Sequence, residues 1–320
     1  MSRSAPIAVV VTAVEHVAQD IKRFSMQRAD GQSLPHFSPG SHVTVEMPVP
    51  GGHKRNPYSL MGPLDDPHTY QISVLRVLQS RGGSQFMHDA VNVGDQLQIS
   101  EPFNLFQPES IARRHILIAG GIGITPFMAM TQRFAAATIP FELHYAVRSR
   151  SRAAYADVLS AQIGSHVHFY CDDEGDVLDV RKILSGQPLG THLYVCGPEG
   201  MIDAVLNAAR EEGWPEEYLH CERFTAAPSG EPFDVRLVRS NLTVHVPANQ
   251  TVLEAVEQAG IDAPCLCRGG ACGQCETAII SHDGALIHND HYLSDDDKAS
   301  GEKIMICVSR LAAGTLTLDL

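Results

Sequence analysis

Cysteines gather near the C-terminal end of the chain, where four of them fall within eleven residues and a further one follows at Cys307. Cys267, Cys272 and Cys275 have the spacing C-x4-C-x2-C, which with a distant fourth thiolate is the plant-type pattern of a 2Fe-2S cluster. Each of the two ferric irons takes two cysteine sulfurs beside the bridging sulfides, so the cluster needs four thiolates. The sequence therefore predicts a 2Fe-2S cluster whose metal ligands are Cys267, Cys272, Cys275 and Cys307.

Glycines lie between these cysteines, at Gly269, Gly270 and Gly273. A loop wrapped around a cluster must aim backbone N–H groups at the sulfurs, which requires backbone conformations and close approaches that glycine tolerates best. These glycines therefore suit a loop that binds a cluster.

Two other uses of the cysteines compete with this interpretation. A zinc site with four cysteine ligands normally pairs two C-x2-C units, and this segment has one. Disulfides are disfavoured because the chain has no secretion signal, which indicates a reducing compartment. Cys265 replaces Cys267 in the pattern only if the first gap grows to six residues, so we interpret Cys265 as a bystander.

Length and charge narrow the class of protein. At 320 residues the chain has room for two or three domains. A net charge of -13 argues against nucleic acid as a partner, since phosphate binding needs concentrated Lys and Arg. The longest apolar segment, Ile116 to Met130, is interrupted by glycines and a proline and is too short to span a bilayer. With no cleavable signal at the N-terminus, we expect a soluble cytoplasmic protein without membrane contact.

The first segment of the chain has short β-rich runs separated by turn residues. Breaks at Pro39-Gly40 and at residues 50–52 favour an antiparallel β-barrel or sandwich. The expected strands are Ile7 to Val11, Val43 to Met47, Tyr58 to Met61, Tyr70 to Leu78 and Gln96 to Ser100.

Arg81-Gly82-Gly83-Ser84 opens what is predicted to be a helix through His88. Free N–H groups, the positive end of the helix dipole and a hydroxyl converge at such a place, which suits a phosphate. A plain turn with Ser84 as the N-cap explains the same residues. A second stretch, residues 55–60, puts an arginine, a tyrosine and a serine at the start of a strand.

The middle segment alternates between strand and helix, which predicts a parallel sheet flanked by helices with its ligand crevice at the carboxyl ends of the strands. A tight turn at Gly120 to Pro126 separates the first strand from its helix, with Thr125 as N-cap and Pro126 at the first helical position. The expected strands are His115 to Ala119, Phe141 to Val147, Val167 to Cys171 and His192 to Cys196, and the expected helices are Phe127 to Ala137 and one through Ala209.

Both glycine turns of this segment lie at the carboxyl ends of strands, so we expect a nucleotide over Gly120 to Thr125 and Cys196 to Pro198. The first turn is not the G-x-G-x-x-G fingerprint, which disfavours a standard Rossmann dehydrogenase. Asp172 and Asp173 follow another strand and suit ribose hydroxyls while repelling a 2'-phosphate, which favours NADH over NADPH. The same carboxylates are equally expected in a solvated loop.

The last segment predicts a β-grasp arrangement around the cysteine loop. A hairpin is expected at Asp234 to Val238 and Leu242 to Val246, followed by a helix at Val252 to Gln258. After the cysteine loop come strands at Thr277 to Ser281 and Ile304 to Val308, and the second of these brings Cys307 to the cluster.

Taken in order, these motifs give the chain a resemblance over essentially its whole length to the phthalate dioxygenase reductase family, which includes vanillate demethylase reductases. The resemblance rests on six motifs: Tyr58-Ser59-Leu60, Arg81-Gly82-Gly83-Ser84, Ile118 to Pro126, Cys196-Gly197-Pro198, Cys267 to Cys275 and Ile306 to Arg310. The resemblance implies an FMN-binding β-barrel domain at 1–108, an NADH-binding α/β domain at 109–228 and a plant-type ferredoxin domain at 233–320. It also implies a monomer that passes electrons transiently to a separate terminal oxygenase.

The resemblance further implies roles for individual residues. Ser59 lies near flavin N5, Phe224 covers the flavin face where nicotinamide enters, and Cys196 stands beside nicotinamide C4, with Glu222 as the fourth catalytic residue. The flavin residues implied in this way are Arg55, Asn56, Tyr58, Ser59, Ser73, Val74, Arg76, Gly82, Gly83, Ser84 and Phe224. The nucleotide residues are Gly121, Gly123, Thr125, Pro126, Asp173, Cys196, Gly197 and Pro198.

One departure from the family concerns the cation that meets the flavin phosphate. The family has Arg two residues before the tyrosine, whereas this chain has Asn56 there and Arg55 one residue earlier. Arg55, Arg81 and Arg76 are the alternatives for that role.

Two alternative functions share these motifs. One is an FAD-dependent oxidase or cytochrome-type reductase of the same fold. The other is an iron–sulfur regulatory or binding protein without hydride chemistry. For the leading hypothesis, the oxygenase served by the chain acts either on an aromatic acid or on a methylated amine.

Overall fold

A computed structural model describes residues 5–49, 52–78, 81–225 and 227–320. The chain divides into two compact units. Unit 1 consists of Met1–Met47, Tyr58–Leu78 and Ser84–Arg223, and unit 2 consists of Pro48–Pro57, Gln79–Gly83 and Phe224–Leu320. The expected boundary between residues 108 and 109 lies inside unit 1 and stays a prediction. The sequence did not indicate that two short segments from the first third of the chain belong to the same unit as the C-terminal region.

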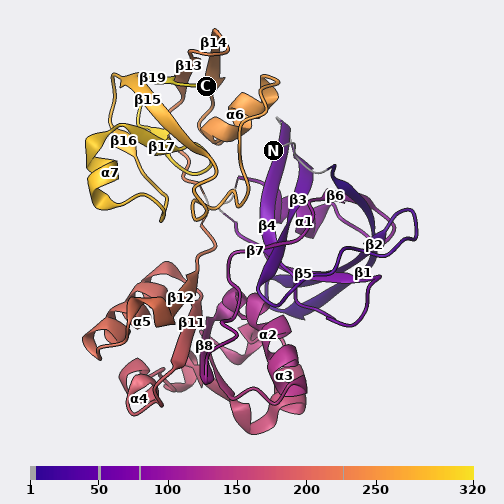
Figure 1. Ribbon diagram of the computed structural model, residues 1–320. Helices are drawn as coiled ribbons and strands as arrows, with labels where there is room; N and C mark the ends of the chain where they lie inside the picture. The colour runs from indigo at the N-terminus through magenta and orange to yellow at the C-terminus, as the bar shows by residue number, and fades with distance from the viewer. Residues whose placement is uncertain (1–4, 50–51, 79–80, 226) are drawn as a thin grey trace. The chain divides into compact units, whose positions relative to one another are not determined.

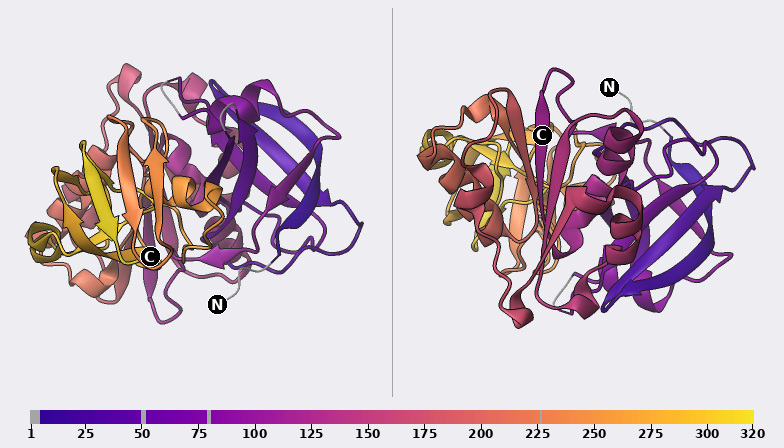
Figure 2. Two further views of the ribbon diagram at one scale, coloured as in Figure 1. Left: turned by 90° about the horizontal axis from the view of Figure 1, so that it is seen from above. Right: turned by 90° about the horizontal axis from the view of Figure 1, so that it is seen from below.

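An antiparallel sheet forms the N-terminal part of the fold, with the strand order β4-β3-β6-β1-β2-β5 and with β7 paired to β3. Its strands are β1 (Ile7–Ala18), β2 (Ile21–Arg28), β3 (Ser41–Val49), β4 (Gly52–Ser59), β5 (Tyr70–Leu75), β6 (Gln96–Ile99) and β7 (Phe103–Asn104). Alternate residues of β3, namely Val43, Val45 and Met47, are fully buried, as expected for a sheet with one face in a core. Figure 2 shows these strands, drawn from indigo to purple, curving strongly.

The predicted antiparallel domain is confirmed, with local differences. The strand pairings of the described residues form a path that ends at β4 and β5, so they trace an open sheet. Strand β4 ends at Ser59, whereas the sequence predicted a strand from Tyr58 to Met61. Strand β2 was not predicted, because Lys22 and Arg23 interrupt its apolar alternation. The expected helix is present as α1 (Gly83–Asp89).

A parallel sheet follows in unit 1, with the order β10-β9-β8-β11-β12 and with every pairing parallel. Its strands are β8 (Arg114–Gly120), β9 (Phe141–Val147), β10 (Val167–Cys171), β11 (Thr191–Cys196) and β12 (Leu219–Glu222). From β8 the chain proceeds outward through β9 and β10, then crosses to β11 on the other side. The strand order therefore reverses between β8 and β11, which is where open α/β sheets bind their ligands.

Helices cover both faces of this sheet (Figure 1). They are α2 (Thr125–Ala136) and α3 (Ala156–Ile163) on one face, and α4 (Val180–Leu184) and α5 (Glu199–Glu211) on the other. Leu117 and Phe127 contribute to the core on the first face, and Ile118 and Ile202 to the core on the second. The predicted α/β class is confirmed, while α3 and β12 were not expected from the sequence.

The start of α2 differs from the prediction. Thr125 is the first helical residue rather than the N-cap, with φ -58° and ψ -45°, because a 3-10 turn at Gly121–Ile124 runs directly into the helix. Its hydroxyl donates back to the carbonyl oxygen of Ile122 at 3.1 Å. Pro126 lies in the first turn, where its missing N–H leaves no helical hydrogen bond unmade.

Unit 2 contains a mixed sheet with the order β14-β13-β19-β15-β17 and a small sheet of β16 and β18. Its strands are β13 (Phe233–Leu237), β14 (Leu242–Val246), β15 (Glu276–His282), β16 (Leu286–Ile287), β17 (Lys303–Met305), β18 (Arg310–Leu311) and β19 (Thr315–Leu318). Helix α6 (Val252–Gln258) packs into the core of unit 2 through Val252, Leu253 and Val256, and α7 (Asp295–Ser300) is short. The predicted β-grasp arrangement is confirmed, although Cys307 follows β17 rather than lying within a strand.

Among the described residues, every helix is too short or too polar to cross a membrane.

Candidate cofactor sites

The four cysteines of the predicted cluster lie together in unit 2. Cys267, Cys275 and Cys307 are buried, and Cys272 is half-buried. The Cys267 sulfur is within hydrogen-bonding range of the sulfurs of Cys272 and Cys307, and Cys275 is within the same range of Cys307. Cys267 and Cys272 come from the loop after α6, Cys275 directly precedes β15, and Cys307 follows β17. The fold thus brings four thiols from separate segments close enough to share one inorganic centre.

Backbone N–H groups stabilise negative charge on one of these sulfurs. The amides of Gly269 and Ala271 each donate to Cys267 Sγ at 3.4 Å. Hydrogen bonds from the Cys272 and Cys307 thiols, together with these two amides, hold the pKa of Cys267 far below its usual range. The site therefore favours the thiolate, which is the form that binds metal.

Close packing of the loop explains its glycines. A Cβ atom on Gly273, whose φ is +75°, would lie 2.3 Å from the Tyr292 ring, and one on Gly270 would lie 2.7 Å from a methyl group of Val308. No side chain fits at either position without displacing its neighbour. Converging thiols, amides aimed at sulfur and a loop without room for side chains together fit a 2Fe-2S cluster.

Cys265 contacts a different set of groups. Its sulfur lies 3.5 Å from the Arg268 guanidinium and 3.9 Å from a Glu257 carboxylate oxygen. Arg268 also forms an ion pair with Glu257, and both side chains are about 9% exposed. This arrangement fits the interpretation of Cys265 as a bystander, and it ties the cysteine loop to α6.

Two glutamates of α6 form ion pairs with lysine and arginine side chains from the two short N-terminal segments of unit 2. Glu254 forms ion pairs with Lys54 at 3.0 Å and with Arg81 at 2.7 Å, and Glu257 forms one with Arg55 at 2.9 Å. Burial lowers the pKa of Lys54, and the Glu254 carboxylate opposes that shift. Removing one partner of a buried pair of this kind typically costs about 3–5 kcal/mol, because the other charge is left uncompensated.

The sequence analysis missed this ion-pair network, although part of its signal was present. The motif Thr251-x-x-Glu254 is a capping box, in which the Thr251 hydroxyl accepts from the Glu254 amide and the Glu254 carboxylate accepts from the Thr251 amide. That motif predicts where α6 begins. The cation partners come from residues about 200 positions earlier in the chain, which no local pattern indicates.

Several of the predicted flavin residues are described in unit 1. Tyr58 and Ser59 end β4, and Ser73 and Val74 lie on β5. Ser59 is 4% exposed, and its hydroxyl makes no hydrogen bond of good geometry within the described residues. A buried hydroxyl in this state is a group that a bound ligand can satisfy.

Other predicted flavin residues already have partners in the protein. The Ser73 hydroxyl is 2.5 Å from the Tyr155 hydroxyl, and the amide of Val77 donates to Ser84 Oγ at 3.2 Å. Arg76 forms an ion pair with Asp89 at 2.8 Å, so Arg55, Arg81 and Arg76 are all paired with carboxylates. The remaining flavin candidates of unit 2 are Asn56, Gly82, Gly83 and Phe224.

The two glycine turns of the parallel sheet pack directly against each other. A Cβ atom on Gly123 would lie 2.2 Å from the carbonyl oxygen of Cys196, and one on Gly197 would lie 3.0 Å from the backbone of Gly120. The turn after β8 therefore approaches the turn after β11 backbone to backbone, at the reversal of strand order. This arrangement brings Gly121, Gly123, Thr125 and Pro126 beside Cys196, Gly197 and Pro198 and forms a site suited to a nucleotide.

Asp173 lies at the same edge of the sheet but farther along it. It follows β10 in a 3-10 turn at Asp172–Glu174, and its amide donates to the carbonyl oxygen of Arg148 at 3.2 Å. Strand β9 lies between β10 and β8, so Asp173 is about 10 Å from β8 at the usual spacing of strands. It is on the correct edge to meet the distal part of a nucleotide.

Cys196 and Glu222 are opposite each other on the parallel strands β11 and β12, so their side chains lie on the same face. Cys196 is fully buried, and burial raises the pKa of its thiol well above the usual range. Burial also raises the pKa of Glu222 to about 8, against an opposing effect of the nearby Ser59 hydroxyl. At pH 7 the site therefore holds a neutral thiol and a neutral carboxylic acid.

A parallel sheet with a nucleotide site, an antiparallel sheet and a β-grasp unit with four converging thiols together define an iron–sulfur oxidoreductase. Residues 97–219 match the family described as dimethylamine monooxygenase subunit DmmA-like, N-terminal domain. Residues 235–312 match the 2Fe-2S iron-sulfur cluster binding domain.

Relatives cover nearly the whole chain. It is 48% identical over 313 residues to the carnitine monooxygenase reductase subunit of Acinetobacter baumannii, with 97% of each chain covered. It is 42% identical over 321 residues to the vanillate O-demethylase oxidoreductase of Pseudomonas sp., with 98% of this chain and 100% of the other covered. The chain also superposes on the solved structure of phthalate dioxygenase reductase with a TM-score of 0.89 at 34% identity, covering 99% of this chain and 98% of the other. That protein is described as a modular structure for electron transfer from pyridine nucleotides to 2Fe-2S.

The chain therefore belongs to the phthalate dioxygenase reductase family, as its motifs predicted. It is the reductase component of a multicomponent oxygenase and moves electrons from NADH through FMN to a 2Fe-2S cluster and on to a separate terminal oxygenase.

The cluster assignment predicts opposite results for two cysteine substitutions. Cys307→Ser removes one of the four converging thiols and is expected to abolish the visible 2Fe-2S absorption, with iron content falling from about two atoms per chain. Cys265→Ser is the matched control and is expected to keep both. Iron analysis and visible spectra of the purified variants measure this. Zinc in place of iron in the unsubstituted protein, or iron lost from Cys265→Ser and kept in Cys307→Ser, would contradict the assignment.

The glycine packing predicts a position-specific effect on nucleotide binding. Gly123→Ala forces the Cys196 backbone away and is expected to raise the KM for NADH by about 10- to 100-fold, the range for a displacement of about 1 Å at a reacting site. Gly200→Ala, in the first turn of α5, places its methyl group in open space and is expected to leave the KM unchanged. Steady-state kinetics with ferricyanide as the electron acceptor measure both variants. Equal KM values for the two would show that close approach of the turns is unimportant.

Proposed function

We propose that the buried groups at the ends of β4, β11 and β12 form the site where hydride leaves NADH. Ser59 has a buried hydroxyl available to a ligand, and Cys196 presents a neutral thiol at the nucleotide turns. Glu222 keeps its proton at pH 7, against the opposing effect of the Ser59 hydroxyl, which donates to the carboxylate form. While Glu222 is neutral, no carboxylate charge attracts the Ser59 O–H, which is then free to point at bound flavin. Phe224, two residues after Glu222, covers the flavin until nicotinamide enters.

The flavin links the two kinds of electron transfer, because it accepts two electrons as a hydride and releases them singly. The protein holds its phosphate through Gly82, Gly83 and Ser84, with Arg55 and Arg81 as the cations. Tyr58 and the β5 residues Ser73 and Val74 line the ring system. Asp173 meets the ribose of NADH and disfavours NADPH.

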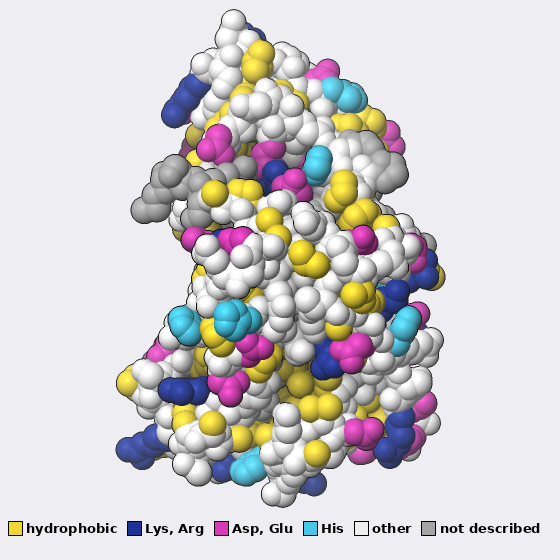
Figure 3. Space-filling model, turned by 90° about the vertical axis from the view of Figure 1, so that its right-hand side faces the viewer, with side chains coloured by type: hydrophobic (Ala, Val, Ile, Leu, Met, Phe, Trp, Pro, Cys, Tyr) yellow, Lys and Arg dark blue, Asp and Glu magenta, His cyan; other side chains and the backbone are white. Residues whose placement is uncertain are grey.

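Electrons leave through the half-buried side of the cluster loop. Cys272 is the least buried of the four cluster cysteines, and Leu266, which directly precedes Cys267, is 41% exposed. Tyr292, which packs on Gly273, is 51% exposed. These apolar groups suit a small interface of the kind made in transient redox encounters. The face in Figure 3 has acidic and basic side chains interspersed, with neither sign dominating it.

The chain works as a monomer that meets its oxygenase transiently. Its domains are 1–108 for FMN, 109–228 for NADH and 233–320 for the cluster. We place the protein in the cytoplasm, where a reducing environment keeps the cysteines available as cluster ligands.

The oxygenase that receives the electrons acts on a substrate with methyl groups on nitrogen. Two sequence comparisons support this class over aromatic acids. Residues 97–219 match a family described by dimethylamine monooxygenase, and the carnitine monooxygenase reductase subunit is 48% identical, against 42% for the vanillate enzyme. The electron-transfer function itself is supported mainly by one observation, namely that the four cluster thiols lie close together.

A coupling assay tests the partner class. The holoenzyme is mixed in turn with the purified oxygenase component of a carnitine monooxygenase and with that of a vanillate O-demethylase, each with its substrate. We expect substrate-dependent NADH oxidation at least about tenfold faster with the first, because specificity between related partners is a difference of affinities. The Cys307→Ser variant should support neither. Faster coupling with the vanillate enzyme would refute the substrate class while leaving the reductase function intact.

The protonation state of Glu222 predicts a pH dependence. Below pH 8 the carboxyl group is neutral, and above pH 8 it becomes an anion that accepts the Ser59 O–H and draws it away from the flavin. The rate of flavin reduction by NADH should therefore fall above pH 8, by up to about tenfold per pH unit. Glu222→Gln keeps a neutral hydrogen-bond donor and should remove this decline. Stopped-flow reduction between pH 6 and 10 measures the profile.

Glu217→Gln, an exposed glutamate nearby in sequence, serves as the control and should keep the decline. An unchanged decline in Glu222→Gln would assign the titration to another group.

A further inference from the structure

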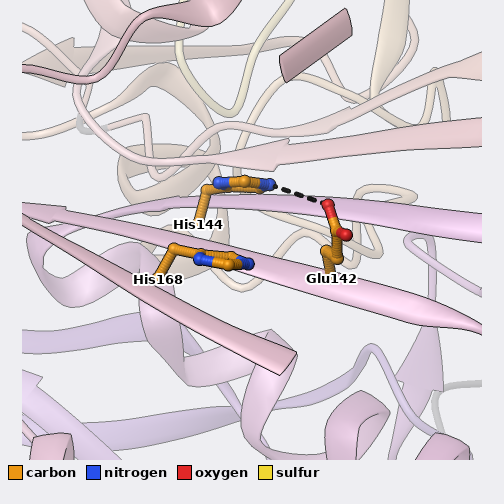
Figure 4. Close-up of side chains that lie close together, drawn as sticks. All are labelled: Glu142, His144 and His168. Carbon is orange, nitrogen blue, oxygen red and sulfur yellow. Dashed lines mark ion pairs between the residues drawn. The ribbon is translucent and has the colours of Figure 1, made fainter. Parts of the chain in front are cut away.

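Three side chains on the parallel sheet of unit 1 are arranged to hold a metal ion (Figure 4). Glu142 and His144 are two residues apart on β9, so they lie on the same face of the sheet. His168 on β10 is directly opposite His144 in the strand register. Ile116, the partner of Glu142 on β8, belongs to the core under α4 and α5, which places the three side chains on that face.

The donor atoms are close together. One ligand atom from each residue lies within 4.8 Å of the other two, and His144 Nε2 is 3.4 Å from Glu142 Oε2. The two imidazole rings are stacked with centroids 4.9 Å apart. In a tetrahedral zinc site with bonds of about 2.0–2.1 Å, the ligand atoms are about 3.3 Å apart. His168 is exposed and can therefore rotate by the distance required.

A buried nitrogen that contacts the Glu142 carboxylate but makes no hydrogen bond of good geometry points into this cluster. His144 is 5% exposed, and its Nε2 atom makes no hydrogen bond within the described residues. The other ring nitrogen, Nδ1, is 2.9 Å from the Tyr170 hydroxyl. Since Tyr170 fixes the ring, Nε2 faces the Glu142 carboxylate, and a cation between them would satisfy both atoms.

Neighbouring groups orient the ligands in the way that metal sites require. Tyr170 holds the His144 ring, and Arg114 binds Oε1 of Glu142, which leaves Oε2 directed at His144. Partners of this kind around a metal site fix the ring orientation and the tautomer of the ligands. Arg114 is also a positive charge beside the site, and the Glu142 carboxylate lies between it and the donor nitrogens.

We propose that Glu142, His144 and His168 bind one divalent transition-metal ion, with water in the remaining position. Two imidazoles and a carboxylate suit zinc, nickel or copper, whereas magnesium and calcium prefer oxygen donors. The bound ion ties β10, the edge strand of the sheet, to β9. It thereby restrains the segment that follows β10 and carries Asp173. This site is separate from the cluster and from the nucleotide turns, so the proposal stands independently of the residue roles proposed above.

The test uses the holoenzyme with its iron–sulfur cluster intact, after treatment with a mild chelator. Titration with Zn2+ by calorimetry, followed by metal analysis after gel filtration, is expected to show one bound equivalent. His168→Gln should lose it, while His16→Gln, an exposed histidine on β1, should retain it. Tyr170→Phe should weaken binding by roughly tenfold, the lower end of the effect of removing a group that orients a ligand.

Cu2+ provides a second readout, because the oxidised cluster gives no paramagnetic signal of its own. The copper spectrum is expected to show coupling to two nitrogens in the unsubstituted protein and to lose it in His168→Gln. The visible cluster spectrum confirms that each variant is folded. Equal zinc binding by the protein and by His168→Gln would assign the ion to an adventitious thiol such as Cys221. Absence of binding would show that His144 and Glu142 contact each other without holding a metal. Either outcome overturns the proposal.

Discussion

The position of α6 is the constraint on which the cluster site depends. The cysteine loop starts shortly after this helix, and Arg268 within the loop forms an ion pair with Glu257 of the helix. The capping box at Thr251 and Glu254 fixes where the helix begins, and its apolar residues fix which face enters the core. A shift of α6 would therefore move the first two cluster sulfurs relative to Cys275 and Cys307, which are anchored by β15 and β17. Four thiols share one centre only if all these elements keep their register.

The proposed nucleotide site also depends on the exact position of loops, but there the groups in contact are backbone atoms rather than sulfurs. At the reversal of strand order, the turns after β8 and β11 touch through glycines, so backbone meets backbone at the place proposed for the nucleotide. A side chain on Gly123 would force the two turns apart. Both loops need glycine, because a side chain at these positions would collide with neighbouring atoms. The surrounding secondary structure keeps the loops rigid. Function thus rests on loops held by a rigid scaffold.

Local patterns predicted much of this architecture. Helix α6 and strands β9 and β10 were predicted with their observed bounds, since each is a distinct apolar segment between turn residues, and the cysteine spacing selected four thiols that lie close together in the structure. Strand β2 was missed because charged residues interrupt its alternation, and Thr125 was placed one step outside its helix. The sequence could not indicate the ion pairs of Glu254 and Glu257, because their partners are set by tertiary packing of segments far apart in the chain. For the same reason it gave no sign that His144 and His168 are opposite each other.

The ion pairs around α6 also bear on which cation meets the flavin phosphate. Glu254 is shared by Lys54 and Arg81, and Glu257 is shared by Arg55 and Arg268. Among the ion pairs of the described residues, four cations thus meet two carboxylates in unit 2, and Arg81 directly precedes Gly82 and Gly83 in the chain. A phosphate monoester carries close to two negative charges at neutral pH. The glutamates orient these arginines, so a phosphate would meet cations that are already in position. For the proposed contact with the flavin phosphate we therefore favour Arg55 and Arg81, which lie in unit 2 with Gly82 and Gly83, over Arg76, which lies in unit 1 and pairs with Asp89.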